Sequence, residues 1–171
     1  LGVVGDWNND SFDTPGVFRK GCWIMTDNYE ASEGTPPFEF GDPGDIPVVG
    51  DWNGPENGIK TDTVGYYRGT TFYLRCSNTR GLPDKEFDIG VAGIPVAGDW
   101  NGDRRDGVGV FVDGHWKLHE FEPEADYEFD FGTPGTIPVI GDWNNDLIDT
   151  VGVVESTMPF QEPDRNENNG R

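Results

Sequence analysis

Short segments of alternating hydrophobic and polar residues recur along the chain, separated by Gly, Pro, Asp and Asn. Phe72 and Leu74 would share one face of a strand. Trp116 and Leu118 repeat this arrangement further along. The segments are rich in Val, Tyr, Phe and Trp, as half-buried strands are. Because no apolar pattern keeps the helical period for three turns, we predict an all-β chain with near-zero helix.

The segments belong to a repeating unit. Gly-Asp-Trp-Asn occurs four times, at intervals of 45, 48 and 43 residues. Three copies follow Phe-x-(Phe/Ile)-Gly and Ile-Pro-Val, and Asp-(Thr/Gly)-(Pro/Val)-Gly comes after every copy. A strand-rich repeat of this length is typical of propeller blades or another stacked β array. We therefore expect tandem β-propeller-like blades, each with three to four short antiparallel strands, and the proline of Ile-Pro-Val should lie on an edge strand.

We expect one repeat domain over residues 1–171, with units that start near residues 1, 46, 94 and 137 and a polar tail at 161–171. The first and last units each lack part of the pattern, and incomplete units leave unpaired strand edges. Residues 1–7 could complete the last blade of the same chain. They could instead complete that of a neighbouring chain, giving a head-to-tail ring or filament. The missing third strand of the last unit favours self-association.

Composition narrows the classes of partner. Lys and Arg number 12 and Asp and Glu 32, so the net charge of −20 argues against nucleic acid and anionic membranes. No apolar run approaches the ~20 residues of a membrane span, and we expect no membrane insertion. The 25 Gly and 13 Pro fit a turn-rich fold, whereas six Trp, five Tyr and eleven Phe are too many for a disordered chain.

The acidic loop after each repeated Asp is a candidate calcium site. In three loops, side-chain oxygens recur at loop positions 1, 3, 5 and 8, and the carbonyl at position 7 is a further candidate. A tightly curled loop can turn these oxygens to one centre, which suits Ca²⁺ better than Mg²⁺. Asp and Asn also simply favour turns, but turns would not require a repeated carboxylate spacing. The candidates are Asp6, Asn8, Asp10, Phe12 and Asp13; Asp99, Asn101, Asp103, Arg105 and Asp106; and Asp142, Asn144, Asp146, Ile148 and Asp149.

The second loop departs from this pattern. It is four residues longer, and Pro55 stands where the third oxygen ligand would be. Its candidate ligands are Asp51, Asn53, Glu56, Asn57 and Asp62, for which we expect lower affinity. The chain is therefore predicted to bind three to four calcium ions.

The loops and the fuller unit resemble the FG-GAP/VCBS-type repeats of bacterial secreted proteins and of integrin alpha-chain propellers. The similarity extends to about Phe160. It implies propeller-like blades, loop-bound calcium and an extracellular or cell-surface location, and it is compatible with adhesion, display or accessory roles. The chain departs from the family at loop position 6, where the usual Gly is Ser11, Arg104 or Leu147. It also has only four loops, fewer than a full propeller of the family.

Other candidate chemistry is sparse. The four repeated Trp residues could stack on a ligand, but each ends a strand, so we expect them to pack between sheets. Cys22 and Cys76 could pair in an extracellular protein, although they fall at different points of successive strands. His115 and His119 are expected on a solvent-facing polar ladder rather than in a zinc site. No catalytic signature occurs, and we expect no enzyme, no catalytic residue and no cofactor besides calcium.

Two functions follow from these patterns. The first is a non-catalytic, calcium-stabilised extracellular structural or adhesive repeat protein that self-assembles head to tail. The second is a carbohydrate- or protein-binding module accessory to a secreted hydrolase, with a glycan or a surface protein as partner. The first predicts that Trp and Tyr are buried at equivalent places in each repeat. The second predicts an exposed aromatic cluster on one face that breaks the repeat.

Overall fold

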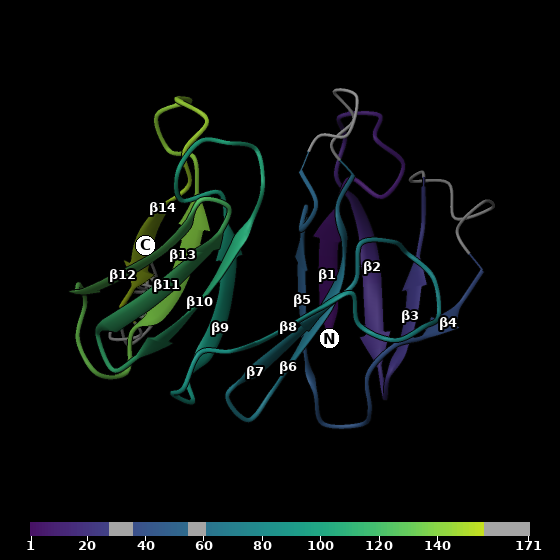
Figure 1. Ribbon diagram of the computed structural model, residues 1–171, viewed down its shortest axis with the longest axis horizontal. Helices are drawn as coiled ribbons and strands as arrows, with labels where there is room; N and C mark the ends of the chain where they lie inside the picture. The colour runs from purple at the N-terminus through teal and green to yellow at the C-terminus, as the bar shows by residue number, and fades with distance from the viewer. Residues whose placement is uncertain (28–35, 55–60, 156–171) are drawn as a thin grey trace, which may run out of the picture.

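The computed structural model describes residues 1–27, 36–54 and 61–155. Within these ranges, 14 strands form four small antiparallel sheets and there is no helix (Figure 1). The prediction of an all-β chain is therefore confirmed. In the same ranges no helix has the length and apolar character needed to cross a bilayer.

The strands of each sheet follow one another in chain order. The first sheet contains β1 (Gly2–Gly5), β2 (Thr14–Arg19), β3 (Cys22–Met25) and β4 (Phe38–Glu39). The second contains β5 (Ile46–Gly50), β6 (Thr63–Arg68), β7 (Thr71–Leu74) and β8 (Lys85–Asp88). The third contains β9 (Ile94–Gly98), β10 (Gly107–Val112), β11 (His115–Phe121) and β12 (Glu124–Asp130), and the fourth contains β13 (Ile137–Gly141) and β14 (Thr150–Val154). The Ile-Pro-Val strands β5, β9 and β13 are all edge strands, as their prolines predict.

The first sheet has four strands, although the first unit lacks the Ile-Pro-Val that precedes the other motifs. β1 runs antiparallel to β2, with Gly2 opposite Val17 and Gly5 opposite Thr14. It takes the place in its sheet that β5 and β9 take in theirs. Because β1 is already paired within its own sheet, it does not complete the fourth sheet. That sheet holds only β13 and β14 within the described ranges.

A small hydrophobic core lies between each pair of consecutive sheets. In every core a repeated Trp of one sheet packs with two residues of the next sheet. The sets are Trp7 with Val64 and Tyr66, Trp52 with Val108 and Val110, and Trp100 with Val151 and Val153. The first strands of consecutive sheets therefore lie side by side, β1 by β5, β5 by β9 and β9 by β13. The predicted packing of Trp between sheets is confirmed for these three, whereas Trp143 is 63% exposed.

The Gly of Gly-Asp-Trp-Asn leaves room for the Trp ring. Each ring folds back over the Gly two residues earlier, so a Cβ at Gly50 would lie 2.8 Å from two carbon atoms of Trp52. The corresponding distances from the Trp ring are 2.9 Å at Gly5, 3.0 Å at Gly98 and 3.1 Å at Gly141. The repeated Gly is therefore required by close packing, since a larger side chain would displace the ring.

Candidate metal-binding loops and their links between sheets

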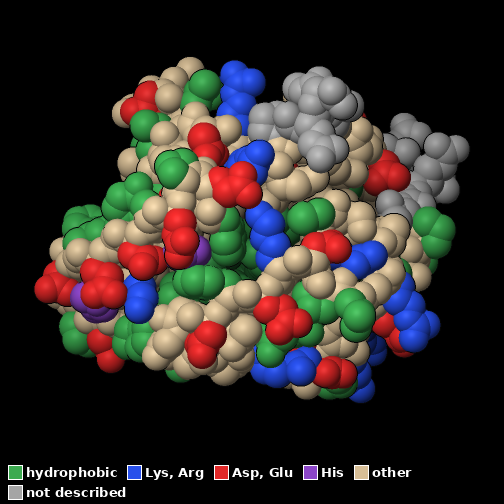
Figure 2. Space-filling model, viewed as in Figure 1, with side chains coloured by type: hydrophobic (Ala, Val, Ile, Leu, Met, Phe, Trp, Pro, Cys, Tyr) green, Lys and Arg blue, Asp and Glu red, His purple; other side chains and the backbone are tan. Residues whose placement is uncertain are grey.

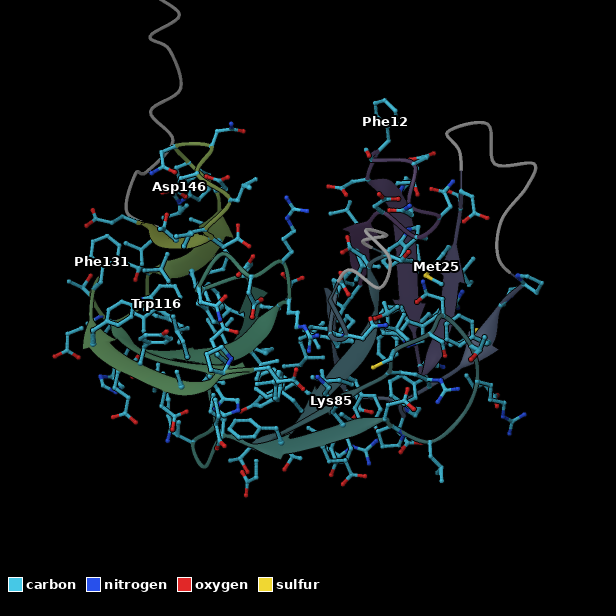
Figure 3. The ribbon with its side chains drawn as sticks, turned by 45° about the horizontal axis from the view of Figure 1, so that its top comes forward. Phe12, Met25, Lys85, Trp116, Phe131 and Asp146 are labelled. Carbon is cyan, nitrogen blue, oxygen red and sulfur yellow. The ribbon has the colours of Figure 1, made fainter. Side chains whose placement is uncertain are left out.

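The predicted metal loops join the first two strands of their sheets and gather at one end of the molecule. The loops β1–β2, β9–β10 and β13–β14 all lie at the upper end of Figure 1. Figure 3 shows Phe12 projecting from the first of these loops and Asp146 in the last. The sheets therefore present the three repeated acidic segments on the same side.

The side chains at positions 1, 3 and 5 are brought together by hydrogen bonds within each loop. Asp6 accepts the N–H of Asp10 at 3.0 Å and that of Ser11 at 2.9 Å. Asn8 Oδ1 accepts the N–H of Asp10 at 3.2 Å, and Asp10 Oδ1 accepts that of Phe12 at 2.9 Å. The equivalent bonds recur around Asp99, Asn101 and Asp103, and around Asp142, Asn144 and Asp146. The N–H groups at position 7, those of Phe12, Arg105 and Ile148, all donate to the carboxylate at position 5.

Two left-handed residues give these loops their tight curl. At position 6, Ser11, Arg104 and Leu147 have φ of 69°, 70° and 72°. At position 4, Asn9, Gly102 and Asn145 have φ of 58°, 80° and 62°. The position that the resemblance expects to hold Gly is therefore left-handed here too, but it carries side chains that disfavour this conformation.

Replacing Leu147 with Gly is expected to stabilise the protein. Leu147 is 58% exposed, so the change removes left-handed strain and little packing. We expect Leu147→Gly to raise the free energy of unfolding by about 0.5–1 kcal/mol, measured by chemical denaturation. Leu82→Gly is the control, because Leu82 is 83% exposed and is not left-handed. Equal effects of the two substitutions would contradict the assignment of strain to position 147.

The carboxylates at the last position of the loops link one sheet to the preceding one. The Oδ2 atoms of Asp62, Asp106 and Asp149 accept the N–H groups of Asp6, Asp51 and Asp99 at 2.9, 2.8 and 2.9 Å. In return, the N–H groups of Asp62, Asp106 and Asp149 donate to the carbonyls of Asp6, Asp51 and Asp99 at 3.0, 2.9 and 2.8 Å. These residues, predicted as ligands of their own loops, thus form a reciprocal pair with the loop before. Asp13, at the same position of the first loop, is exposed.

The second loop is described only in part. Asp51 is fully buried, and its Oδ1 accepts the N–H of Gly54 at 2.9 Å. Asn53 follows Trp52 at the start of the loop and is partly exposed. The predicted ligands Glu56 and Asn57 lie outside the described residues.

Two charged side chains from other strands of the same sheets support the loops by bonding to the backbone of the repeated Trp residues. Glu120 is 1% exposed, and its Oε1 accepts the N–H of Trp100 at 2.8 Å. Burial raises the pKa of Glu120 to about 8, although the Trp100 N–H favours the charged form. Lys85, labelled in Figure 3, donates from Nζ to the carbonyl of Trp52 at 2.7 Å. The sequence contains no signal for either contact, because both residues lie among other charged residues.

The described ranges hold no group of three or more acidic, histidine or cysteine side chains arranged to bind a metal ion. Within one loop, positions 1, 3 and 5 supply two carboxylates and an amide, while the third carboxylate of the later loops bonds to the preceding loop. The two thiols, Cys22 and Cys76, are not joined in a disulfide.

The two histidines lie in different environments, so only one matches the expected polar ladder. His115 is exposed, and its Nδ1 lies 2.8 Å from Asp130 Oδ1. His119 is 3% exposed, because Phe87 of the second sheet stacks on its ring at a centroid distance of 3.8 Å. The alternation of β11 placed both on one face, but the neighbouring sheet covers one end of that face.

No protein-family model, curated protein or solved structure matches the chain. Its functional interpretation therefore rests on the loops and sheets described above.

Proposed function

We propose that the chain is a non-catalytic, calcium-stabilised structural repeat protein of the extracellular space or the cell surface, built from propeller-like blades. The observation that carries this proposal is the reciprocal pair of hydrogen bonds that joins each later loop to the loop before it. Together with the buried Trp of each core, this pair gives the repeated residues a role in holding sheets together.

The arrangement of strands supports the propeller-like blades. Three of the sheets have four strands in chain order, and the first strands of consecutive sheets lie side by side. Radial repetition of small four-stranded sheets is the plan of a propeller, and it leaves only short sheet edges. Calcium bound in the loops would then lie at the end of each blade where the first strand leads into the second.

The chemistry of the loops fits a hard cation at positions 1, 3 and 5. A carboxylate oxygen that accepts one backbone N–H still has a second lone pair, so Asp6 and Asp10 keep acceptor capacity. Asn8 Nδ2 donates to Asp10 Oδ2 at 3.1 Å, and the equivalent distances are 3.3 Å in the third loop and 2.9 Å in the fourth. When bound, calcium would supply the positive charge that relieves repulsion between these carboxylates.

A non-catalytic role is supported by the position of the acid with the raised pKa. Perturbed carboxylates often mark active sites, but a catalytic group must reach its substrate. Glu120 is 1% exposed and bonds to the backbone of Trp100. Its environment is that of a structural residue beneath the third loop.

Calcium binding is tested by isothermal titration and by melting in excess chelator, then in calcium, then in sodium. Calcium at ten times its Kd should stabilise by roughly 1.4 kcal/mol per site, so chelator should lower the melting temperature and calcium alone restore it. Asp103→Asn keeps an acceptor for the Arg105 N–H but loses the carboxylate, so it should bind one ion fewer. Glu86→Asn, on an exposed position, is the control. An unchanged melting temperature in chelator would reject the calcium assignment.

One observation favours a binding module as the second candidate. A hollow of about 310 Å³ between the third and fourth sheets is lined in part by Trp100, Leu118, Tyr127 and Phe129. Exposed aromatic side chains gather on β12 and after it, with Tyr127 40%, Phe129 37% and Phe131 48% exposed. The equivalents of Phe131, Phe40 and Ile89, are 4% and 1% exposed, so this cluster breaks the repeat. Figure 2 shows hydrophobic side chains among acidic ones at this end of the viewed face.

A glycan array separates the two candidates. A binding module should retain specific glycans, and Tyr127→Ala should weaken that binding more than tenfold, as loss of a central aromatic does. Phe12→Ala is the matched control, because Phe12 is also exposed, at 66%, but lies in the first loop. If no glycan binds while melting still depends on calcium, the result favours the structural role over a glycan-binding module.

A further inference from the structure

The three interfaces between consecutive sheets share one design. A Trp from one sheet lies against the next sheet, at the level of that sheet's second strand. In the first interface, Trp7 shares its core with Val64 and Tyr66, while Val49 and Tyr73 pack at its margin. These four covering residues come from adjacent strands β5, β6 and β7, with Val49 opposite Val64 and Tyr66 opposite Tyr73.

The fourth sheet presents the Trp half of this design without a cover among the described residues. Trp143 is 63% exposed and Val154 is 50% exposed. The Trp143 ring nevertheless lies over its own sheet as the buried rings do. A Cβ at Gly141 would be 3.1 Å from it, and one at Gly152 would be 3.8 Å from it. We refer to Val139, Trp143 and Val154 as the fourth-sheet face. Its Trp ring already takes the position over its own sheet that the Trp rings take in the three internal interfaces.

The first sheet presents the covering half of the same design. Val4, Pro15, Val17 and Ile24 stand at the positions of Val49, Val64, Tyr66 and Tyr73. Val4 is 64%, Val17 44% and Ile24 43% exposed, and Pro15 is also exposed. Val4 lies opposite Pro15, and Val17 lies opposite Ile24, so the four side chains form one continuous apolar surface, the first-sheet face. Contiguous apolar surface of this kind marks an interaction site.

We propose that the fourth-sheet face of one copy of this chain docks on the first-sheet face of a second copy. The occupant follows from continuity with the interfaces inside the chain, since three Trp residues are already covered by residues at the positions of Val4, Pro15 and Val17. The two faces differ, so the contact is heterologous and extends head to tail into a ring or a filament. This inference rests on the proposed structural function and names its partner, but it does not require calcium.

The contact differs from the exchange of a terminal strand. β1 stays paired with β2 in its own sheet, and docking uses the face of that sheet rather than its unpaired edge. The same geometry brings Asp13 of one copy towards Asp142 of the other, at the positions of Asp62 and Asp6 in the first internal interface. The net charge of −20 opposes association, so salt should strengthen it.

Sedimentation velocity of the full chain tests the contact at high micromolar concentration and physiological salt. The wild type should form species heavier than 18.9 kDa. Val17→Lys and Trp143→Lys each block one face and should weaken association more than tenfold, because each places a charge at the centre of the interface. An equimolar mixture of the two variants retains one intact pair of faces and should form dimers of twice 18.9 kDa. Leu82→Lys, at an exposed site on neither face, should associate like the wild type.

Three results would overturn the inference. They are a monomeric wild type at these concentrations, undiminished association of either single variant, and a mixture of the variants that stays monomeric. If a variant misfolds by circular dichroism, Ile24→Lys replaces Val17→Lys and Val154→Lys replaces Trp143→Lys. A monomeric wild type in which residues 156–171 shield Trp143 from a fluorescence quencher would assign the face to the chain's own tail. Calcium-dependent melting of the monomeric variants tests the proposed function separately.

Discussion

Trp52→Ala is expected to lower the free energy of unfolding by about 3–5 kcal/mol, as large-to-small changes at buried aromatic sites do. Trp52 is fully buried between the second and third sheets and packs with Val108 and Val110. Truncation removes its buried surface and leaves a cavity bounded by two sheets that cannot collapse independently. The change therefore weakens an interface as well as a core.

Trp143→Ala is the matched comparison, because the same tetrapeptide holds both residues. Trp143 is 63% exposed, and at dilute concentration its truncation should change the free energy of unfolding by no more than about 0.5 kcal/mol. Both variants are measured by urea denaturation of the dilute protein. Similar losses at the two positions would contradict the view that the covering sheet, rather than the tetrapeptide itself, gives the Trp its stabilising role.

Glu120→Gln is expected to stabilise the protein, and increasingly so as pH rises. Burial raises the pKa of Glu120 from 4.5 to about 8, so the folded state holds its proton where the unfolded state releases it. The stability that the protonated side chain contributes is complete below about pH 4.5 and is lost as pH rises through about 8. Between these pH values the free energy of unfolding of the wild type should fall, relative to that of the variant, by up to about 1.4 kcal/mol per pH unit.

The variant isolates this titration from that of the other acids. Gln keeps an oxygen acceptor for the N–H of Trp100 but carries no charge. Unfolding is measured in chelator from pH 4.5 to pH 8, where the difference between variant and wild type should grow from near zero to a few kcal/mol. Glu86→Gln removes a charge from an exposed position and should change stability by no more than about 0.5 kcal/mol at any pH. A difference for Glu120→Gln that is flat with pH would contradict the buried-charge explanation.

Much of the fold is local and was therefore readable from the sequence. The alternation of Phe72 with Leu74 places both on the buried face of β7, because strand geometry turns every second side chain the same way. The edge position of the Ile-Pro-Val strands follows from a missing backbone donor. The Asp-x-Asn-x-Asp spacing likewise predicted a tight curl, since the side chains at positions 1, 3 and 5 bond to backbone N–H groups only a few residues away.

Relations between repeats were decided by the tertiary structure alone. The Asp at the last loop position looks like a ligand of its own loop, yet Asp62 bonds to Asp6, 56 residues earlier. The stacking of His119 on Phe87 also depends on how a neighbouring sheet packs. Identical tetrapeptides give a buried Trp52 and an exposed Trp143 for the same reason. The sequence by itself determined the strands, the loops and the repeat, because these depend on chain geometry over a few residues. Only the packing of one sheet on the next decided which carboxylates, rings and charges meet, because those contacts join residues that no local pattern connects.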